Sequence, residues 1–398
     1  MSQPTVVRSL SGFTFAWPDL SLTITLMRIR ESSQGLKAEL VASHRDEHGK
    51  ERVIIHQSCN LLTSKSRLAS ELGKRQPAPW DSMLEQVCVT ALRDLRLGEP
   101  VETLTSDEED LRPSSFVLNP LLYEDEPTVI FGPGDSLKSF LLLYCALLLC
   151  NGAEGPHLRC SPEPRRVLWL DWEMSRRNVA GRVRMLQRGH PHLVLTPDYR
   201  RMTHGLADTA DEIRGIIEAG SYDVLCIDSL GMAAGARELE KAESPIAFFS
   251  ALRGLGLPTL IIGHSPKPRD GQAPSLYGNV YFRNLARVSW EVRREGNIVG
   301  LYQDKNNLGP AHDPLGWTLD MQGDICTVSE GDLLSDPALA SHLPLQDQIA
   351  AYLKRSPGST PMEVAEGIHA KHSSVKSKLH ACPRFIAIGE GKYDCLDA

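Results

Sequence analysis

The stretch TVIFGPGDSLKS at residues 128–139 decides the fold of this chain. Residues 128–132 predict a buried strand, and the apolar run at residues 140–150 predicts a buried helix. Between them lies a loop with two glycines that ends in Lys138 and Ser139. A strand, such a loop and a helix N-terminus together present backbone N–H groups to anionic oxygens, so the stretch predicts a phosphate-binding loop.

The side chains at the end of the loop indicate which ligand it binds. A lysine at this position reaches the β and γ phosphates of a nucleotide, and the hydroxyl that follows binds Mg²⁺. We therefore expect ATP and Mg²⁺ at Lys138 and Ser139. Leu137 occupies the position where a glycine normally precedes the lysine, and its side chain narrows the allowed backbone angles. The alternative is a turn between a strand and a helix that binds no nucleotide.

Short apolar runs alternate with helical segments after this loop. The runs lie at residues 128–132, 166–172, 223–230 and 258–265, and helices are expected at 138–150, 175–188, 209–219 and 245–254. Wholly apolar strands are typical of a parallel sheet that is covered on both faces, so the pattern predicts a doubly wound α/β domain. Four further runs, at 287–295, 297–305, 317–321 and 324–329, predict an antiparallel extension of this sheet.

Three polar residues stand where expected strands end. Glu173 follows the strand at 166–172, where a carboxylate can polarise the attacking water, although a solvated strand end has the same pattern. Asp228 ends the next strand and can accept a hydrogen bond from Ser139 and hold Mg²⁺. His264 can sense the γ-phosphate or be merely structural. The residues expected to bind the nucleotide are Gly132, Pro133, Gly134, Asp135, Ser136, Leu137, Lys138, Ser139, Phe140 and Asp228, with Ser139 and Asp228 as the Mg²⁺ ligands.

The loop and the segments LWLDWE (168–173), DVLCIDSL (223–230) and LIIGHSPK (260–267) occur in the order and at the spacing of RecA-like ATPases. Over about residues 120–320 the chain most resembles the RepA-type branch, the hexameric replicative helicases of plasmids and phages. This resemblance implies that Glu173 is the catalytic base and that His264 is the strand-tip histidine of the family.

The same resemblance implies that a neighbouring subunit completes the site. The family has a Lys-x-Arg finger that enters the next subunit, and residues 304–307 are similar to it, but Asn307 replaces the arginine. A family segment with Arg-Asn before a Trp-Glu strand resembles residues 278–291. Lys305 or Arg283 would then supply the charge in trans within a ring-shaped homo-oligomer.

We expect four parts in the chain. Residues 1–100 predict a small α+β domain with strands, a hairpin and a helix near 81–97, and residues 101–116 read as an acidic linker. The RecA-like domain spans 117–335. Residues 342–398 resemble a winged helix, with helices at 346–354, after a capping box at Thr360–Glu363, and at 374–381, followed by a hairpin.

Several surfaces are candidates for DNA contact. Single-stranded DNA would meet the loops at 231–243 and 266–279, of which the second carries cations and an aromatic residue. Duplex DNA would meet the winged helix, although its charges nearly cancel and a protein contact is the alternative. The cations of its third helix and turn are Lys371, His372, Lys376, Lys378, His380 and Lys392. Helix 175–188 presents a basic face for DNA or a subunit, or simply for solvent, formed by Arg176, Arg177, Arg182, Arg184 and Arg188.

The composition agrees with a globular protein and excludes several classes. The 398 residues carry 43 Lys or Arg against 50 Asp or Glu, a net charge of −7, which excludes a strongly basic nucleic-acid coat. No apolar run is long enough to span a membrane, and the N-terminus lacks the layout of a signal peptide. The 9 cysteines are scattered and form no CxxC pair, which favours reduced thiols in the cytoplasm.

These observations lead to one main hypothesis, a ring that hydrolyses ATP and acts on DNA as a motor or helicase in a plasmid, phage or repair system. The second is an ATP-gated oligomeric switch that binds DNA with little turnover, which Leu137 and Asn307 favour. A DNA-binding regulator with a vestigial ATPase fold and a small-molecule kinase are further alternatives. The strand-end Glu173 and the long β extension suit the RecA group better than a kinase.

Overall fold

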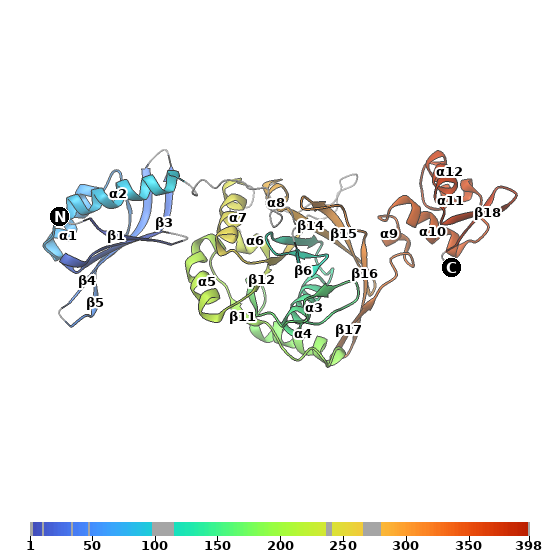
Figure 1. The fold of residues 1–398 in the computed structure, drawn as a ribbon, viewed down its shortest axis with the longest axis horizontal. Coiled ribbons are helices and arrows are strands. Elements are labelled where there is room, and N and C mark those ends of the chain that lie inside the picture. The colour runs from blue at the N-terminus through green and yellow to red at the C-terminus, as the bar shows by residue number, and fades with distance from the viewer. Residues whose placement is uncertain are drawn as a thin grey trace, which may run out of the picture. The chain divides into compact units, whose positions relative to one another are not determined.

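A nine-stranded sheet forms around the phosphate loop in the computed structural model, which describes residues 3–9, 12–32, 35–46, 48–97, 115–235, 241–265 and 280–396. The strand order is β11-β10-β12-β13-β8-β14-β15-β16-β17 (Figure 1). Neighbouring strands from β11 to β14 run parallel, whereas β15, β16 and β17 each run antiparallel to the strand before. The predicted α/β class, mainly parallel with an antiparallel extension, is confirmed.

The strands of this sheet and their connecting helices agree closely with the predicted runs, except that β11, α6 and α8 were not predicted. The strands are β8 (Thr128–Gly132), β10 (Val167–Asp171), β11 (Asp198–Arg201), β12 (Val224–Asp228), β13 (Thr259–His264), β14 (Val288–Glu295), β15 (Ile298–Asn306), β16 (Leu315–Gln322) and β17 (Ile325–Glu330). The helices are α3 (Lys138–Asn151), α4 (Arg176–Gly189), α5 (Leu206–Gly220), α6 (Leu230–Ala233), α7 (Glu243–Leu255) and α8 (Val280–Leu285). The edge strand β11 is short and mostly exposed, and the apolar pattern of the sequence did not predict it.

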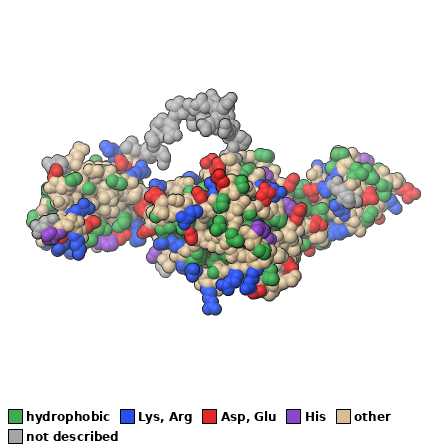
Figure 2. Space-filling view, turned by 60° about the horizontal axis from the view of Figure 1, so that its bottom comes forward, with side chains coloured by type: hydrophobic (Ala, Val, Ile, Leu, Met, Phe, Trp, Pro, Cys, Tyr) green, Lys and Arg blue, Asp and Glu red, His purple; other side chains and the backbone are tan. Residues whose placement is uncertain are grey.

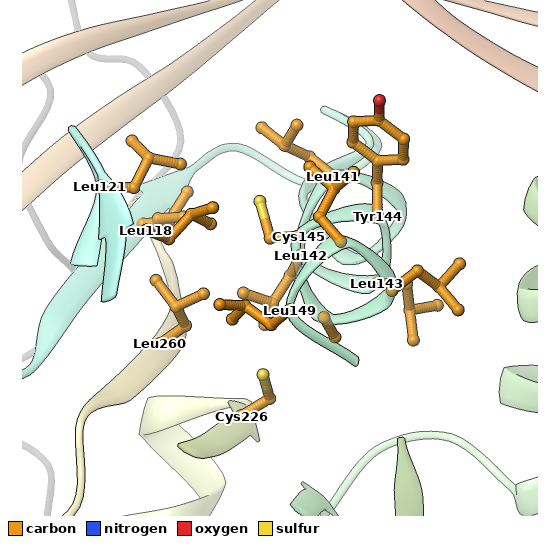
Figure 3. Close-up of a cluster of buried hydrophobic side chains, with 14 of the residues drawn as sticks. Leu118, Leu121, Leu141, Leu142, Leu143, Tyr144, Cys145, Leu149, Cys226 and Leu260 are labelled. Carbon is orange, nitrogen blue, oxygen red and sulfur yellow. The ribbon is translucent and has the colours of Figure 1, made fainter. Parts of the chain in front are cut away.

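Helix α3, which begins at Lys138, is buried on every side from Phe140 to Cys150. A helix that is apolar all round must be enclosed by other elements, and α3 contacts strands of the parallel sheet on one side and α4 on another. Side chains of β16 and β17, among them Trp317 and Val328, belong to the same core. Figure 3 shows Leu142 and Leu149 on the side of α3 that faces Cys226 and Leu260 of the sheet, with Leu143 on the opposite side of the helix.

Two small elements complete this part of the chain. Strands β6 (Phe116–Asn119), β7 (Leu122–Tyr123) and β9 (Arg159–Cys160) form a sheet of order β7-β6-β9 just before and after the phosphate-loop unit. Helix α9 (Pro337–Ala340) follows β17, and Tyr302 Oη donates a hydrogen bond to the carbonyl of Leu339 at 2.8 Å.

By its contacts the chain divides into two compact units, residues 1–112 with 206–216 and 250–255, and residues 113–205, 217–249 and 256–398. Within the first unit, strands alternate between buried apolar and partly exposed residues, as in Phe13, Phe15 and Trp17, and form a sheet of order β1-β2-β3-β4-β5. Its elements are β1 (Thr5–Arg8), β2 (Phe13–Trp17), a 3-10 turn (Pro18–Leu20), β3 (Leu22–Ser32), β4 (Gly35–Arg45), β5 (Glu51–Asn60), α1 (Lys65–Arg75) and α2 (Trp80–Leu97). Helix α1 had not been predicted.

The C-terminal segment contains α10 (Leu345–Arg355), α11 (Pro361–Gly367), α12 (His372–Ala381) and the hairpin β18 (Phe385–Gly389) and β19 (Lys392–Cys395). The predicted capping box is confirmed, because Thr360 Oγ1 accepts from the Glu363 N–H while the Glu363 side chain accepts from the Thr360 N–H. This order of elements is the predicted one, and the winged-helix assignment stays a prediction. Within the described ranges, no helix is long and apolar enough to cross a membrane.

Candidate active site

The phosphate loop leaves β8 at Gly132 and carries two non-glycine residues in the left-handed backbone region. The φ angles of Asp135 and Leu137 are +60° and +62°, so Leu137 adopts the conformation that the absent glycine would favour. Its side chain packs against the core around α3, which compensates for part of the strain. Position 132 must be a glycine, because a Cβ atom on Gly132 would lie 2.6 Å from the carbonyl oxygen of Val292.

Lys138 lies buried at the centre of the loop, with 5% of its surface exposed. Its Nζ donates hydrogen bonds to the carbonyl of Gly132 at 2.9 Å and to Ser136 Oγ at 3.1 Å. Burial lowers the pKa of Lys138 to about 8, against the opposing effect of nearby carboxylates, of which Asp228 is the strongest. The ammonium is thus held by the loop itself, in the place from which a phosphate-loop lysine meets the ligand.

Ser139 and Asp228 meet although β8 and β12 are separated by β13. The Ser139 hydroxyl donates to Asp228 Oδ2 at 2.9 Å. Burial and, to a smaller extent, the carboxylate of Asp171 raise the pKa of Asp228, the hydrogen bond from Ser139 lowers it, and the net value is about 6. A hydroxyl and a carboxylate side by side are the oxygen ligands that suit Mg²⁺, so this predicted pair fits the cation.

Glu173 and His264 also come together beside the loop. His264 Nε2 lies 3.3 Å from Glu173 Oε1, and the same oxygen accepts a hydrogen bond from the Ser229 hydroxyl. The hydrogen bond with His264 lowers the pKa of Glu173, burial opposes this, and the Ser229 hydrogen bond lowers it again. Glu173 is therefore an ionised carboxylate with 39% of its side chain exposed, a group that can orient water. The sequence did not single out Ser229.

Arg294 on β14 approaches the loop from the side, and no pattern in the sequence singled it out. Its Nη1 donates to the carbonyl of Asp135 at 2.7 Å. A cavity of about 310 Å³ opens between them, lined by Pro133, Gly134, Asp135, Ser136, Arg294 and Gly296. No local motif marks Arg294; only the pairing of β14 with β8 places it here.

The two cations expected to act in trans are both engaged within their own chain. Lys305 Nζ donates to the carbonyls of Arg283, Asn284 and Ala286 at 3.1, 2.9 and 2.7 Å, at the end of α8. Arg283 forms a bidentate pair with Asp304, at 3.0 and 2.9 Å. In the sheet register, Lys305 on β15 lies opposite Ser289 on β14, and Ser289 lies opposite Val129 near the start of β8. The phosphate loop, in contrast, follows the other end of β8. The structure therefore does not bring these cations to Lys138 of the same chain.

The candidate DNA surfaces are described only in part. The loop at 266–279, with Lys267, Arg269 and Tyr277, lies outside the described residues, as do residues 236–240 of the loop at 231–243. Figure 2 shows side chains of both charge signs interspersed over the visible face, with one group of Lys and Arg at the lower edge of the middle part.

The basic face of α4 is less uniform than its sequence suggests. Arg182 lies over the ring of Phe140, 5.0 Å from its centroid, and Arg188 pairs with Asp324. The side chains of Arg176 and Arg184 are exposed, as is that of Arg177. A partly neutralised face of this kind leaves its role as a DNA or subunit contact a prediction.

Comparison with known proteins supports the type of domain. Residues 95–270, less than half of the chain, match the family model described as an AAA domain, and this segment includes the loop, Glu173, Asp228 and His264. No curated protein matches the chain. A solved structure described as an ATPase domain is similar at 11% identity with a TM-score of 0.40, over 61% of this chain and 98% of that chain. The fold assignment rests on the strand order rather than on this likeness.

Proposed function

We propose that this protein is an ATPase whose site is the loop at residues 132–139 with Glu173, Asp228 and His264. The observation that carries the proposal is the meeting of four strand ends around one buried lysine. β8 contributes the loop, β12 Asp228, β13 His264 and the turn after β10 Glu173. The match of residues 95–270 to an AAA domain supports it.

Each side chain has a distinct task in ATP hydrolysis. Lys138 binds the β and γ phosphates, and Ser139 and Asp228 hold Mg²⁺, which neutralises phosphate charge when it is bound. Glu173 orients the water that attacks the γ-phosphorus and accepts its proton. His264, which contacts the Glu173 carboxylate at 3.3 Å, links that carboxylate to the occupancy of the phosphate site.

We further propose that hydrolysis drives a motor that acts on DNA as a ring-shaped homo-oligomer. The loop at 266–279 would contact single-stranded DNA, and α12 with its exposed cations would contact duplex DNA. Lys305 or Arg283 would complete the neighbouring subunit's site. A helicase of a plasmid, phage or repair system is the most specific form of this proposal.

Steady-state ATP hydrolysis, with and without single-stranded DNA, tests the proposal. We expect wild-type turnover that DNA stimulates several-fold. Lys138→Ala should lose both binding and hydrolysis, whereas Glu173→Gln should bind ATP and lose only hydrolysis, because the amide does not accept a proton. Hydrolysis by Glu173→Gln at the wild-type rate would show that the assigned base is wrong.

The alternative is an ATP-gated DNA-binding switch with little turnover. Two observations favour it: Leu137 occupies a left-handed position in the loop, and Lys305 and Arg283 are engaged in their own chain. ATP binding that changes DNA affinity, with negligible turnover in the presence of DNA, would select the switch over the motor.

A further inference from the structure

The turn that carries Glu173 is organised by one buried carboxylate. Asp171 is fully buried, and its Oδ1 accepts hydrogen bonds from the N–H groups of Glu173 and Met174 at 2.8 and 2.6 Å. Its Oδ2 accepts from Trp169 Nε1 at 3.1 Å. Carboxylates that accept several N–H groups fix local geometry strongly, because leaving such a buried charge without partners is costly.

The edge strand β11 holds the other side of this turn. Tyr199 Oη donates to the carbonyl of Met174 at 2.8 Å. Arg201 Nη1 donates to the same carbonyl at 2.5 Å and lies 3.4 Å from Asp171 Oδ1. The backbone of β11 adds the N–H of Met202, which donates to the carbonyl of Asp171 at 2.8 Å. The backbone on both sides of Glu173 is thereby attached to β11, while the Glu173 side chain contacts Ser229 and His264.

We propose that Asp171 and Arg201 are positioning residues for Glu173, with Tyr199 as their auxiliary. They fix the backbone from Asp171 to Met174, and this sets the direction in which the Glu173 carboxylate points. The proposal rests on the function proposed above, in which Glu173 orients the attacking water. A displacement of about 1 Å at a catalytic group can reduce a rate by about 100-fold, so loss of this support should appear in turnover.

The chain supplies a matched control for Arg201. Arg200 is its neighbour on the same strand, is exposed, and has no side-chain partner among the described residues. Because side chains alternate along a strand, Arg200 points to the other face of β11. Replacing either arginine by methionine removes the same charge and keeps the aliphatic stem.

The test measures kcat, KM and the Kd for ATP of the full-length protein. Arg201→Met should lower kcat by about 10- to 100-fold and leave the Kd for ATP unchanged, because the loop at 132–139 is untouched. Arg201→Lys should recover part of this loss, since an ammonium still reaches the Met174 carbonyl. Tyr199→Phe should give a smaller decrease, and Arg200→Met should match the wild type.

Glu173→Gln separates failure of this inference from failure of the proposed function. If Glu173→Gln hydrolyses ATP normally, the role of Glu173 is wrong and the positioning role falls with it. If Glu173→Gln is inactive while Arg201→Met and Tyr199→Phe keep the wild-type kcat, the positioning role alone is wrong. An equal loss in Arg200→Met would also overturn it, since general charge would then be the cause. Should Arg201→Met fail to fold, Arg201→Lys and Tyr199→Phe decide by the same kcat criterion.

Discussion

The hydroxyl of Ser139 donates a hydrogen bond to the carboxylate of Asp228, 2.9 Å away, although 89 positions separate the two residues in the chain. The contact joins the start of α3 to the end of β12. Burial raises the pKa of the Asp228 carboxyl group, and the hydrogen bond from the Ser139 hydroxyl offsets part of this rise. The balance between stability and ligand binding at this pair leads to a first prediction.

Asp228→Asn should stabilise the nucleotide-free protein while removing its response to ATP and Mg²⁺. The folded pKa of Asp228, about 6, lies above its ordinary value of 3.8, so the ionised carboxylate destabilises the fold at pH values above about 6. This penalty disappears as the pH falls from about 6 toward 3.8. Thermal unfolding at pH 8 and pH 4 should therefore show a higher Tm for the variant only at pH 8. A lower Tm at pH 8 would contradict the prediction.

Leu137 should tolerate glycine better than a β-branched residue. The left-handed conformation costs a non-glycine residue about 1–2 kcal/mol, and glycine avoids this cost. Glycine also loses the packing of the leucine side chain, so the two effects partly cancel. Leu137→Gly should keep a Tm near that of the wild type, whereas Leu137→Val should lower it and weaken ATP binding. Thermal unfolding with and without ATP and Mg²⁺ measures both effects. Equal Tm values for the two variants would argue that the loop is not strained.

ATP binding should take up a proton at alkaline pH. The pKa of Lys138 is lowered to about 8, so above that pH the amine is mostly neutral, and the phosphates of ATP should restore its charge. Calorimetric titration at pH 8.5 in buffers of different ionisation enthalpy should show uptake of a fraction of a proton, and the Kd should rise as the pH increases through 8. Lys354→Ala, which removes an exposed lysine of α10 and leaves the loop untouched, serves as the control. Binding without proton uptake would contradict the role of Lys138.

Subunit mixing should reveal whether Lys305 acts in trans. Lys138→Ala lacks the phosphate-binding lysine, and Lys305→Ala lacks the candidate trans cation, so each variant alone should hydrolyse little ATP. In the proposed ring, a mixture of the two variants contains interfaces at which each subunit supplies one intact group, so hydrolysis should reappear. The same mixture with Arg283→Ala tests the other cation. A mixture of Lys138→Ala with Glu173→Gln should not recover hydrolysis, because both residues belong to the site of the same subunit.

The cations of α12 should determine the salt dependence of DNA binding. Lys376 and Lys378 are exposed on this helix, and each lysine that contacts a phosphate contributes about 1 to the slope of log affinity against log salt. Lys376→Ala with Lys378→Ala should weaken duplex binding and reduce this slope by about 2. Lys354→Ala, an exposed lysine of α10, should leave both unchanged. Unaltered DNA binding by the α12 double variant would favour a protein contact instead.

The sequence was sufficient for the elements that have a strong local signal. The wholly apolar strands β8, β10, β12 and β13 stand out because they are buried on both faces, and the carboxyl ends of parallel strands share one sheet edge. The sequence alone therefore places Lys138, Asp228, Glu173 and His264 near one another.

Local sequence patterns could not predict residues whose position depends on neighbouring strands. Strand β11 is short, polar and mostly exposed, so neither its existence nor Tyr199 and Arg201 could be predicted from periodicity. The sequence identified Arg283 as a cation but not its partner Asp304, because this pairing depends on an irregular register between β14 and β15. Position in the sheet, rather than residue type, determined these contacts.

The complete enclosure of α3 has a mechanical consequence. A helix that is close-packed around its whole circumference has no free side along which to roll or slide, since any such movement would open voids in a core of crystal-like density. The helix that anchors the phosphate loop is therefore held in a fixed position. Any rearrangement beside the loop must therefore occur in parts around α3 that keep a solvent-facing side, such as α4.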